Sequence, residues 1–534
     1  MTEAFDYVVV GGGSAGCLAA ARLAGEGGGR VLLLEAGGPY RGLLLRAPAG
    51  FSRILGGTRY LTQHRTLPQA QLGGRVQLIP QARVLGGGSS VNAQAYARGR
   101  AADYDAWGRA TGSDLWSWVT MLPHFVRLEG NARLAGPFHG IDGPLRVSDP
   151  GFVCRTSLLF LLAAQTLGQP LVGDFNAGAP GGAGLIQVTA RDGRRCGAVD
   201  AFLAPLAGDP RLTIRLGARA IRVVLDGTRA AGVEYESGGQ RRVVQAGEVI
   251  VAAGALATPQ LLMMSGIGPA DHLRAHGLAV ALDLPGVGAN LQDHCGAPVI
   301  AAARGRNGYW REDSGWGLVR NGLEYLLFGR GRVAGNGVEA CSFHVPEDGS
   351  RDPVVQVWCV PKTSYADRDV RGVRNVDGIT LHAVLLRPRS RGTVRLASAD
   401  PRALPLVDPR YLSDAADLAH LREGLRAARA LLAARPLADI VTAEISPGPE
   451  ARDDAALDAH LLRTVKTDYH PVGTCRMGAD GDPLAVLDPR CRVRGTEGLR
   501  VLDASAMPLL PSANTNAPTM ALADRAIDLG LASP

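Results

Sequence analysis

The stretch DYHPVGTCRMG, residues 468–478, contains the histidine with the strongest case for chemistry. A neutral imidazole accepts a proton near neutral pH, so His470 is a candidate general base. The same residue type also serves as a metal ligand or as a buried structural side chain, and this stretch alone leaves all three interpretations open. The chain has no H-E-x-x-H pattern and no C-x-x-C pair, so we expect no metal site.

A second chemical signal lies at the start of the chain. FDYVVVGGGSAGCLAAARLA, residues 5–24, passes from a β-branched run through a glycine turn into an alanine-rich helix, and the next apolar run ends in Glu35. This order predicts a dinucleotide-binding unit. Gly11 permits the tight turn, Gly13 lets the backbone approach a pyrophosphate, and Gly16 lets the helix pack on the strand. The helix N-terminus then faces the phosphates, and Glu35 can accept hydrogen bonds from a ribose.

Three short strands are predicted within residues 218–255, where turn signals separate apolar runs. A β-meander that returns to a buried strand is more typical of FAD domains than of simple NAD domains. After it, Thr258 is predicted to cap a helix with Pro259 at its first position, and Gly266 is predicted to end that helix. Two further glycine-dense segments, 83–99 and 284–294, are either surface turns or backbone that closes around one long cofactor.

The elements that position these residues must form more than one core, because 534 residues exceed what a single core usually supports. The net charge of +7 comes from scattered arginines with only two lysines, so nucleic-acid binding is not indicated. The cysteines lie far apart and are expected to be reduced and mostly buried; they are Cys17, Cys154, Cys196, Cys295, Cys341, Cys359, Cys475 and Cys491.

Glu3 and Asp6 stand where a secretory signal would carry positive charge, so we expect a cytoplasmic location. The uncharged run at 156–173 contains Gln, Gly and Pro, which favours a soluble core helix over a membrane span. An amphipathic packing helix is predicted from apolar residues at spacings of three and four, namely Leu418, Leu421, Leu425, Ala428 and Leu432. Residues 300–385 give mixed signals for secondary structure.

The chain resembles the glucose-methanol-choline oxidoreductase family along nearly its whole length. The matching stretches are VVVGGGSAG, ARVLGGGSSVNAQAYARGRAADYDAW, GALATPQLLMMSGIGP, PGVGANLQDH, LRPRSRGTVRL, YHPVGTCRMG and LRVLDASAMPLLPSANTNAPTMALADRA. The resemblance implies an α/β fold in which a Rossmann-like FAD-binding domain interleaves with a substrate domain built on an antiparallel sheet. Residues 1–300 would be mainly FAD-binding, 301–465 mainly substrate-binding, and 466–534 would return to the FAD domain with the catalytic residues.

The resemblance also implies roles for single residues. His470 matches the family's catalytic histidine, which would take the hydroxyl proton of an alcohol while a hydride moves to the flavin, and Asn514 matches the second active-site position, which would orient the substrate oxygen. Contacts to FAD are implied at Gly11, Gly13, Ser14, Ala15, Gly16, Glu35, Ala36, Gly87, Ser89, Asn92, Ala220, Asp503, Ala504 and Thr515. Ser89 and Asn92 have local loop hydrogen bonding as the competing interpretation.

Two departures from the family pattern carry expectations of their own. Relatives that attach FAD covalently have a histidine where this chain has Val91, so the flavin should be noncovalent. Choline-processing relatives commonly have Lys where Arg476 stands here, and no carboxylate for a quaternary amine is identifiable, so choline is not favoured.

The leading hypothesis is therefore an FAD-dependent alcohol oxidase or dehydrogenase. Oxygen, a quinone or another carrier is the electron acceptor, and the oligomeric state is open. A cyanohydrin lyase of the same fold is the first alternative, because such enzymes keep the flavin redox-silent. A noncatalytic flavoprotein that serves as a binding module is the second.

Overall fold

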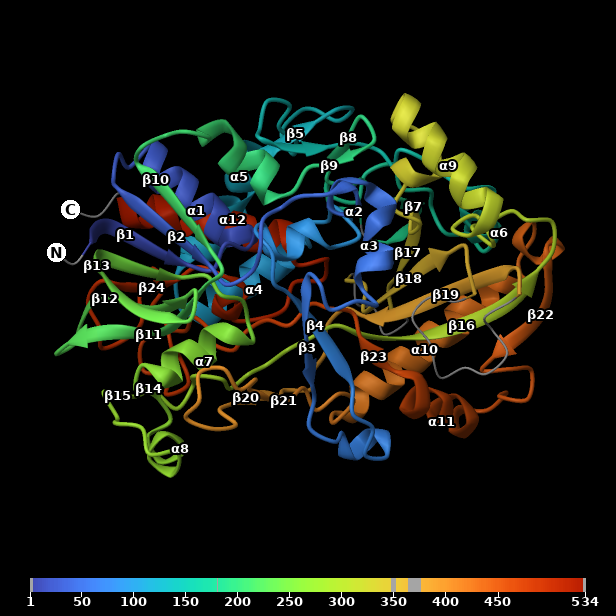
Figure 1. Ribbon diagram of the computed structural model, residues 1–534. Helices are drawn as coiled ribbons and strands as arrows, with labels where there is room; N and C mark the ends of the chain where they lie inside the picture. The colour runs from blue at the N-terminus through green and yellow to red at the C-terminus, as the bar shows by residue number, and fades with distance from the viewer. Residues whose placement is uncertain (1–2, 180, 347–351, 364–375, 532–534) are drawn as a thin grey trace.

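The computed structural model describes residues 3–179, 181–346, 352–363 and 376–531. Two large sheets lie side by side, and the chain passes between them more than once (Figure 1). The first and last long elements of the chain, β1 (Ala4–Val10) and α12 (Asn516–Leu531), belong to the same half of the molecule. The interleaved α/β architecture expected from the sequence is therefore confirmed.

The first sheet is mainly parallel, with the strand order β10-β2-β1-β13-β12-β11 and with β24 beside β13. Its parallel strands besides β1 are β2 (Val31–Glu35), β10 (Leu212–Leu216), β13 (Gln240–Val251) and β24 (Leu499–Val501). The antiparallel strands β11 (Ala218–Asp226) and β12 (Arg229–Ser237) complete the predicted meander with β13. The end of β13 is fully buried at Val249, Ile250 and Val251, as expected for the centre of a parallel sheet.

Helix α1 (Ser14–Gly25) follows β1 directly and packs against both β2 and α12. Its buried face consists largely of alanines, whose small side chains let α12 approach closely. Gly16 has a specific steric role, because a Cβ there would lie 1.8 Å from the carbonyl oxygen of Gly11. Glycine at this position therefore lets α1 pack closely against the end of β1, which is the role that the sequence pattern predicted for Gly16.

The second sheet is antiparallel throughout, with the order β22-β16-β19-β18-β17-β7 and with β23 beside β16. Its strands are β7 (Gly182–Leu185), β16 (Cys295–Ala303), β17 (Ala340–His344), β18 (Val355–Val360), β19 (Gly378–Leu385), β22 (Val441–Ser446) and β23 (Lys466–Thr467). Strand β7 lies within the range assigned mainly to FAD binding, and β16 spans the expected boundary at residue 300. The substrate-side sheet thus takes strands from all three predicted ranges.

Alternation along β18 and β19 separates the two faces of this sheet. Val357 and Leu381 join a core cluster with the helices behind the sheet, whereas Trp358 and His382 point to the opposite face. Behind the sheet lie α6 (Arg155–Thr166), α10 (Ala415–Ala433) and α11 (Asp454–Thr464). The face away from these helices is therefore available to form the wall of a cavity.

Two of these helices test sequence predictions. Helix α10 is the predicted amphipathic packing helix, and Asp414 caps it by accepting a hydrogen bond from the backbone N–H of Ala416. Helix α6 occupies part of the uncharged run and has only twelve residues. Within the described residues, no helix is long and apolar enough to cross a membrane.

The helix predicted at Thr258 begins earlier than expected. Helix α7 runs from Ala257 to Met264, so Thr258 lies inside its first turn and is not its cap. The Thr258 hydroxyl instead donates to the carboxylate of Asp503 at 2.6 Å. A contact across 245 residues thus overrides the local capping signal, while Gly266 follows the helix with a φ of +80°, as a helix-ending glycine requires.

The remaining elements connect the two halves. The helices are α2 (Leu43–Arg46), α3 (Phe51–Ile54), α4 (Ala101–Thr111), α5 (Trp118–Leu128), α8 (Ala270–Ala275) and α9 (Gly315–Phe328). The short strands are β3 (Leu61–Arg65), β4 (Leu78–Ala82), β5 (Glu129–Asn131), β6 (Leu145–Val147), β8 (Ala190–Arg191), β9 (Arg194–Arg195), β14 (Ile267–Gly268), β15 (Leu282–Asp283), β20 (Thr393–Arg395) and β21 (Leu406–Asp408). All eight cysteines are free and buried, as expected for reduced thiols.

Candidate active site

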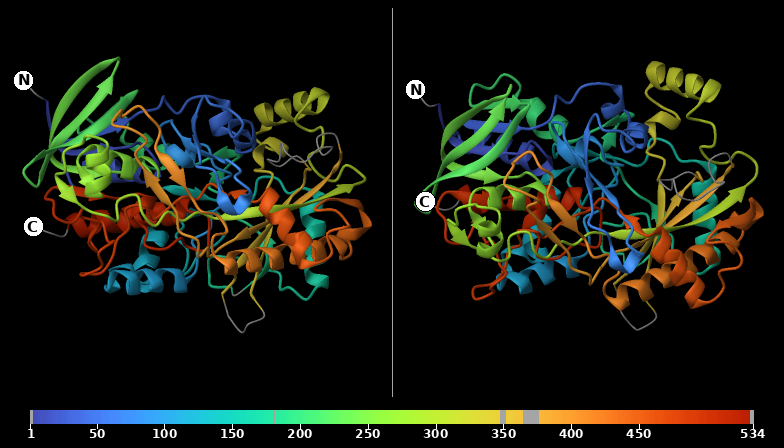
Figure 2. Two further views of the ribbon diagram at one scale, coloured as in Figure 1. Left: turned by 90° about the horizontal axis from the view of Figure 1, so that it is seen from below. Right: turned by 60° about the horizontal axis from the view of Figure 1, so that its bottom comes forward.

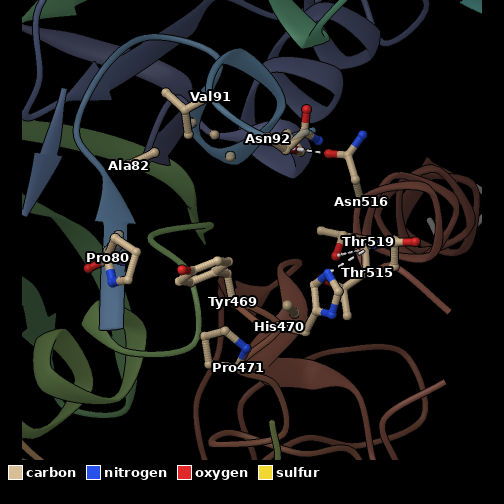
Figure 3. Close-up of a pocket in the computed structure, with 18 of the residues that line it drawn as sticks. Pro80, Ala82, Val91, Asn92, Tyr469, His470, Pro471, Thr515, Asn516 and Thr519 are labelled. Carbon is tan, nitrogen blue, oxygen red and sulfur yellow. Dashed lines mark hydrogen bonds between the residues drawn. The ribbon is translucent and has the colours of Figure 1, made fainter. Parts of the chain in front are cut away.

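A cavity of about 330 Å³ lies between the two sheets and is lined from both. Figure 3 shows Val91 and Asn92 on one side of it, with His470 and Thr515 on another. Most of the predicted site residues line this cavity: Gly11, Gly13, Ser14, Ala15, Glu35, Gly87, Asn92, His470, Asp503, Ala504, Asn514 and Thr515. Residues from both ends of the chain therefore meet in one place.

Two helix N-termini point into one end of the cavity. Helix α1 begins at Ser14 and α12 at Asn516, and the Ser14 hydroxyl donates to the Asn516 side-chain oxygen at 2.8 Å. The unpaired N–H groups and the positive end of each helix dipole favour an anionic ligand there. This end of the cavity therefore suits a phosphate group.

The glycine loop after β4 closes over the same end. Gly87 has a φ of +52°, and a Cβ on it would lie 2.6 Å from the Cα of Gly13. A side chain at Gly87 would therefore collide with the Gly13 backbone. The close approach of the two loops requires glycine at position 87.

Glu35 ends β2 and is buried at the cavity wall. Its carboxylate accepts hydrogen bonds from the backbone N–H groups of Gly12 at 2.8 Å and Gly37 at 2.6 Å. Burial raises the pKa of Glu35, and these two donors oppose that rise. Each carboxylate oxygen keeps a second lone pair for a further donor, as a ribose hydroxyl would supply.

Asp503 links the segment after β24 to the segment after β13 by hydrogen bonds. It follows β24, accepts hydrogen bonds from the backbone N–H of Gly254 and from the Thr258 hydroxyl, and also accepts from the N–H of Ser505. Burial raises its pKa. The carboxylate fixes the loop after β13 beside Ala504, so both residues form one rigid edge of the cavity.

The loop at 87–92 divides into lining and support residues. Val91 and Asn92 line the cavity, whereas the Ser89 hydroxyl donates to the Gly86 carbonyl at 2.6 Å and accepts from the Ala198 N–H at 2.9 Å. Asn92 also accepts a hydrogen bond from the buried Arg195 guanidinium at 2.6 Å. Ser89 therefore acts within the loop and does not reach the cavity.

The ring of His470 lies between two partners. Its Nδ1 is 2.9 Å from Nδ1 of His294, and its Nε2 is 3.3 Å from the side-chain nitrogen of Asn514. The Nε2 of His294 in turn lies 3.0 Å from the backbone carbonyl oxygen of Leu386. Since a carbonyl only accepts, His294 carries its proton on Nε2.

This chain of contacts fixes the tautomer of His470. Burial lowers the pKa of His294 to about 3, so His294 is neutral and its Nδ1 accepts a hydrogen bond. His470 must then donate from Nδ1, which leaves its Nε2 without a proton. Burial also lowers the pKa of His470, so the ring is neutral at neutral pH and Nε2 is available as an acceptor.

The backbone around His470 is held by a buried carboxylate. Asp293 accepts hydrogen bonds from the Tyr411 hydroxyl at 2.5 Å, from the Thr467 hydroxyl at 2.6 Å and from the His470 N–H at 2.8 Å. Burial raises its pKa to about 7 against the pull of these donors. Tyr469, between these anchors, has a φ of +69°, a conformation that the surrounding contacts must stabilise.

A second carboxylate lies in the wall of the cavity. Asp468 pairs with Nε2 of His382 at 3.1 Å, and its backbone N–H donates to the His294 carbonyl at 2.8 Å. The His382 contact and nearby histidines lower the pKa of Asp468 to about 2 despite its burial. Asp468 is therefore ionised, and its charge raises the pKa of His470 against the effect of burial.

Asn514 completes the polar end of the cavity. Its side-chain oxygen is buried and has no hydrogen-bond partner within the described structure, although the amide nitrogen faces His470. A buried amide oxygen without a partner costs about 1 to 3 kcal/mol, which a ligand donor would offset. The His470 and Asn514 pair can thus hold a hydroxyl group from two sides.

The cavity lining also contains apolar side chains from both halves of the molecule. They are Phe51, Leu55, Leu61, Val338, Trp358 and Val360. The carboxylates among the lining residues are Glu35, Asp468 and Asp503, and each has the partners described above. Of these three, ionised Asp468 acts on His470, and it is hydrogen-bonded to His382.

Three predicted cofactor contacts besides Ser89 are not among the lining residues. Gly16 packs α1 against the glycine turn, Ala36 is exposed after β2, and Ala220 lies in β11 among the sheet core. Conversely, His294, Asp293, Asp468 and His382 were not predicted as site residues. The sequence signal for the first two is the LQDH run at 291–294, whose pairing with residue 470 depends on how β16 and β23 align.

The expectation of no metal site also rested on the absence of an H-x-x-x-H pattern, and that premise is wrong for one histidine pair. His272 and His276 have H-x-x-x-H spacing, and their rings lie 4.7 Å apart edge to face. The Nε2 of His272 accepts a hydrogen bond from the backbone N–H of Leu396 at 3.0 Å. In the described part of the chain no group of three His, Cys, Asp or Glu side chains could hold a metal ion.

Comparison with known proteins agrees with this geometry. The GMC oxidoreductase family models match residues 5–296 and 388–523. An alcohol dehydrogenase [acceptor] of Pseudomonas putida is 38% identical over 98% of this chain and 95% of that protein. An oxygen-dependent choline dehydrogenase of Photobacterium profundum is 36% identical over 99% of this chain and 93% of that protein.

Solved structures show the same relationship. Pyridoxine 4-oxidase from Mesorbium loti aligns with a TM-score of 0.87 and 32% identity, covering 98% of each chain. A formate oxidase variant from Aspergillus oryzae aligns with a TM-score of 0.90 and 26% identity over 99% of this chain and 98% of that one. The fold and site define an FAD-dependent oxidoreductase, and the chain belongs to the GMC oxidoreductase family.

Proposed function

We propose that this protein oxidises an apolar alcohol to the corresponding carbonyl compound, with noncovalently bound FAD. The observation that carries the proposal is the pairing of His470 Nε2 with the Asn514 amide in the cavity wall, where the His294 contact keeps Nε2 unprotonated. A base and an amide aimed at one point suit the hydroxyl group of a substrate.

The residues along the rest of the cavity fit an FAD molecule. The two helix N-termini and the Gly13 and Gly87 backbone would take the pyrophosphate, and Glu35 would take the adenosine ribose. Val91 lines the cavity at the position where covalent relatives have a histidine, which supports noncovalent binding. When bound, FAD supplies the electron sink that receives the hydride from the alcohol carbon.

The chain's own residues would move the proton. The substrate hydroxyl donates to His470 Nε2, and the Asn514 amide N–H donates to the substrate oxygen as negative charge develops on it. As Nε2 takes the proton, His470 becomes positively charged, and ionised Asp468 nearby stabilises that charge. The His294 contact keeps the ring oriented throughout.

The proposed substrate class is a neutral alcohol with an apolar body. Aliphatic and aromatic side chains form much of the cavity lining, and Asp468, whose charge acts on His470, already pairs with His382. A quaternary ammonium group would face only Asp468, whose carboxylate already contacts His382, and it would be desolvated against apolar side chains, which costs several kcal/mol. Choline is therefore disfavoured, although several relatives are named for it.

The test is anaerobic reduction of the bound flavin by two alcohols of the same shape. Choline and 3,3-dimethylbutan-1-ol differ only in the charged nitrogen, which a carbon atom replaces. We expect the neutral alcohol to bleach the flavin and choline to do so far more slowly. Faster bleaching by choline would contradict the substrate class, and bleaching by no alcohol would favour a lyase or a binding module.

A further inference from the structure

Helix α9 has its apolar side turned to solvent. Only Asn321 and Tyr325 of its fourteen residues are buried. Seven large apolar side chains are between 41% and 78% exposed, and together they define the α9 face: Trp316, Leu318, Val319, Leu323, Leu326, Leu327 and Phe328. The helix projects from the edge of the molecule (Figure 2). A contiguous apolar surface of this kind marks an interaction site.

The two buried residues anchor the helix in this orientation. The Tyr325 hydroxyl donates to the Gly193 carbonyl at 2.9 Å, and its ring packs with Ala47 and Ala334. The Asn321 amide donates to the Glu312 carbonyl at 2.9 Å. Because specific contacts fix the inner side of the helix, the α9 face cannot simply turn inward.

The chain segments that contain and contact this helix are net basic. Residues 41–53 and 304–332 together contain nine arginines and three carboxylates, whereas the rest of the chain is balanced, with 48 basic and 47 acidic residues. The two segments are in contact, since Arg53 donates to the Asp313 carbonyl at 2.7 Å. Arg320 and Arg330, on and after α9, are 56% and 72% exposed and pair with Glu312 and Glu324. Counted with their carboxylates, the two segments still carry a net charge of +6 (9 − 3) out of the chain's +7.

We propose that the α9 face docks the protein onto the surface of a bilayer rich in anionic lipid. A helix with Trp, Phe and Leu on its outer side and arginines beside them suits the boundary between lipid headgroups and acyl chains. The helix would lie in the plane of the surface and would not cross it. A second copy is the weaker occupant, because a two-fold contact would set these arginines against the same arginines.

The docked orientation has a consequence for the cavity. Helix α2, in the segment that contacts residue 313, has exposed Leu43 and Leu44; it is followed by α3, and Phe51 of α3 lines the cavity. If the proposed alcohol oxidation is correct, an apolar substrate could pass from the bilayer toward His470. The docking itself does not depend on that reaction.

The experiment is vesicle flotation of the full-length, FAD-loaded protein without substrate. We expect the protein to float with vesicles of phosphatidylglycerol and phosphatidylcholine, and not with phosphatidylcholine alone. Combining Leu323→Ser, Leu326→Ser and Leu327→Ser should lower the vesicle partition coefficient by about tenfold or more. Combining Arg320→Glu and Arg330→Glu should weaken binding to the anionic vesicles.

A matched control separates the α9 face from apolar surface in general. Val119→Ser with Ile141→Ser removes two side chains that are 76% and 55% exposed elsewhere, and flotation should persist. All variants should keep their flavin absorbance and their alcohol oxidation with a soluble dye acceptor. The proposal is overturned if the wild type does not float, or if the leucine variant floats equally well. A change from dimer to monomer in the leucine variant, without flotation of the wild type, would instead assign the face to a second copy.

Discussion

At the scale of single residues, the site depends on which nitrogen of His470 carries a proton. The backbone carbonyl of Leu386 sets the proton on His294, and His294 sets the proton on His470. Asn514 faces the deprotonated nitrogen, with its own oxygen unpartnered in the described structure. The different chemistry of the imidazole and the amide predicts different effects when each is removed.

His470→Ala should slow anaerobic flavin reduction by roughly 10²-fold or more, because it removes the base. In the wild type, the pKa of His470 is lowered from 6.5, so the rate should rise with pH to a midpoint below 6.5 and stay flat above it. Asn514→Ala should slow reduction less and keep this profile, because an amide does not ionise in this range. Stopped-flow measurements on variants shown to retain FAD test both assignments, and a near wild-type rate in His470→Ala would refute them.

His294 is predicted to act through His470 without touching the substrate. His294→Ala removes the acceptor for the His470 Nδ1 proton, and one lost hydrogen bond of about 1 kcal/mol corresponds to roughly a fivefold to tenfold slower reduction. His294→Gln offers an amide oxygen in its place and should recover part of the rate. The check is kcat and KM for both variants. Equal losses in the two variants, or a change confined to KM, would count against tautomer control.

At the level of helices and strands, local sequence patterns predicted some elements correctly, whereas contacts between distant parts of the chain could not be predicted. The β1-turn-α1 unit and helix α10 were predictable because each carries its own periodicity and glycine or capping signals. The cap assigned to Thr258 failed because Asp503, far along the chain, takes its hydroxyl. The His294 and His470 contact could not be predicted, since it requires β16 and β23 to pair in one register. The exposed α9 lies in the segment with no clear pattern.

The close contact between the Gly13 and Gly87 backbones predicts that FAD retention depends on glycine at position 87, and a second glycine provides the control. Gly87→Ala should lose bound FAD, because the added Cβ would meet the Gly13 backbone at 2.6 Å in a φ region unsuited to alanine. A Cβ at Gly25, at the C-terminal end of α1 and outside the cavity lining, meets nothing within 4 Å, and its φ is not positive, so Gly25→Ala should retain FAD. The ratio of flavin to protein absorbance after gel filtration measures both. Similar retention in the two variants would show that the close loop contact is not needed.

For the molecule as a whole, the cavity lies between two sheets, and the chain passes from one sheet to the other more than once. Its walls come from the first sheet, the second sheet and the C-terminal segment, so neither half alone can enclose a ligand. Any molecule that fills the cavity touches elements with separate hydrophobic cores. A cofactor here should therefore couple the stability of the two halves as well as supply chemistry.

Removal of FAD should accordingly lower the thermal stability of the entire protein. A ligand present at about a thousand times its Kd stabilises the folded state by about 4 kcal/mol, which for a chain of this size corresponds to roughly 4 °C in Tm. Differential scanning calorimetry of the holoenzyme and of protein stripped of flavin should show this difference, and added FAD should reverse it. An unchanged Tm would mean that the cofactor does not hold the two halves together.

Because Val91 offers no linking nitrogen, the denatured holoenzyme should release all its flavin into solution. Flavin that stays on the unfolded chain would contradict noncovalent binding.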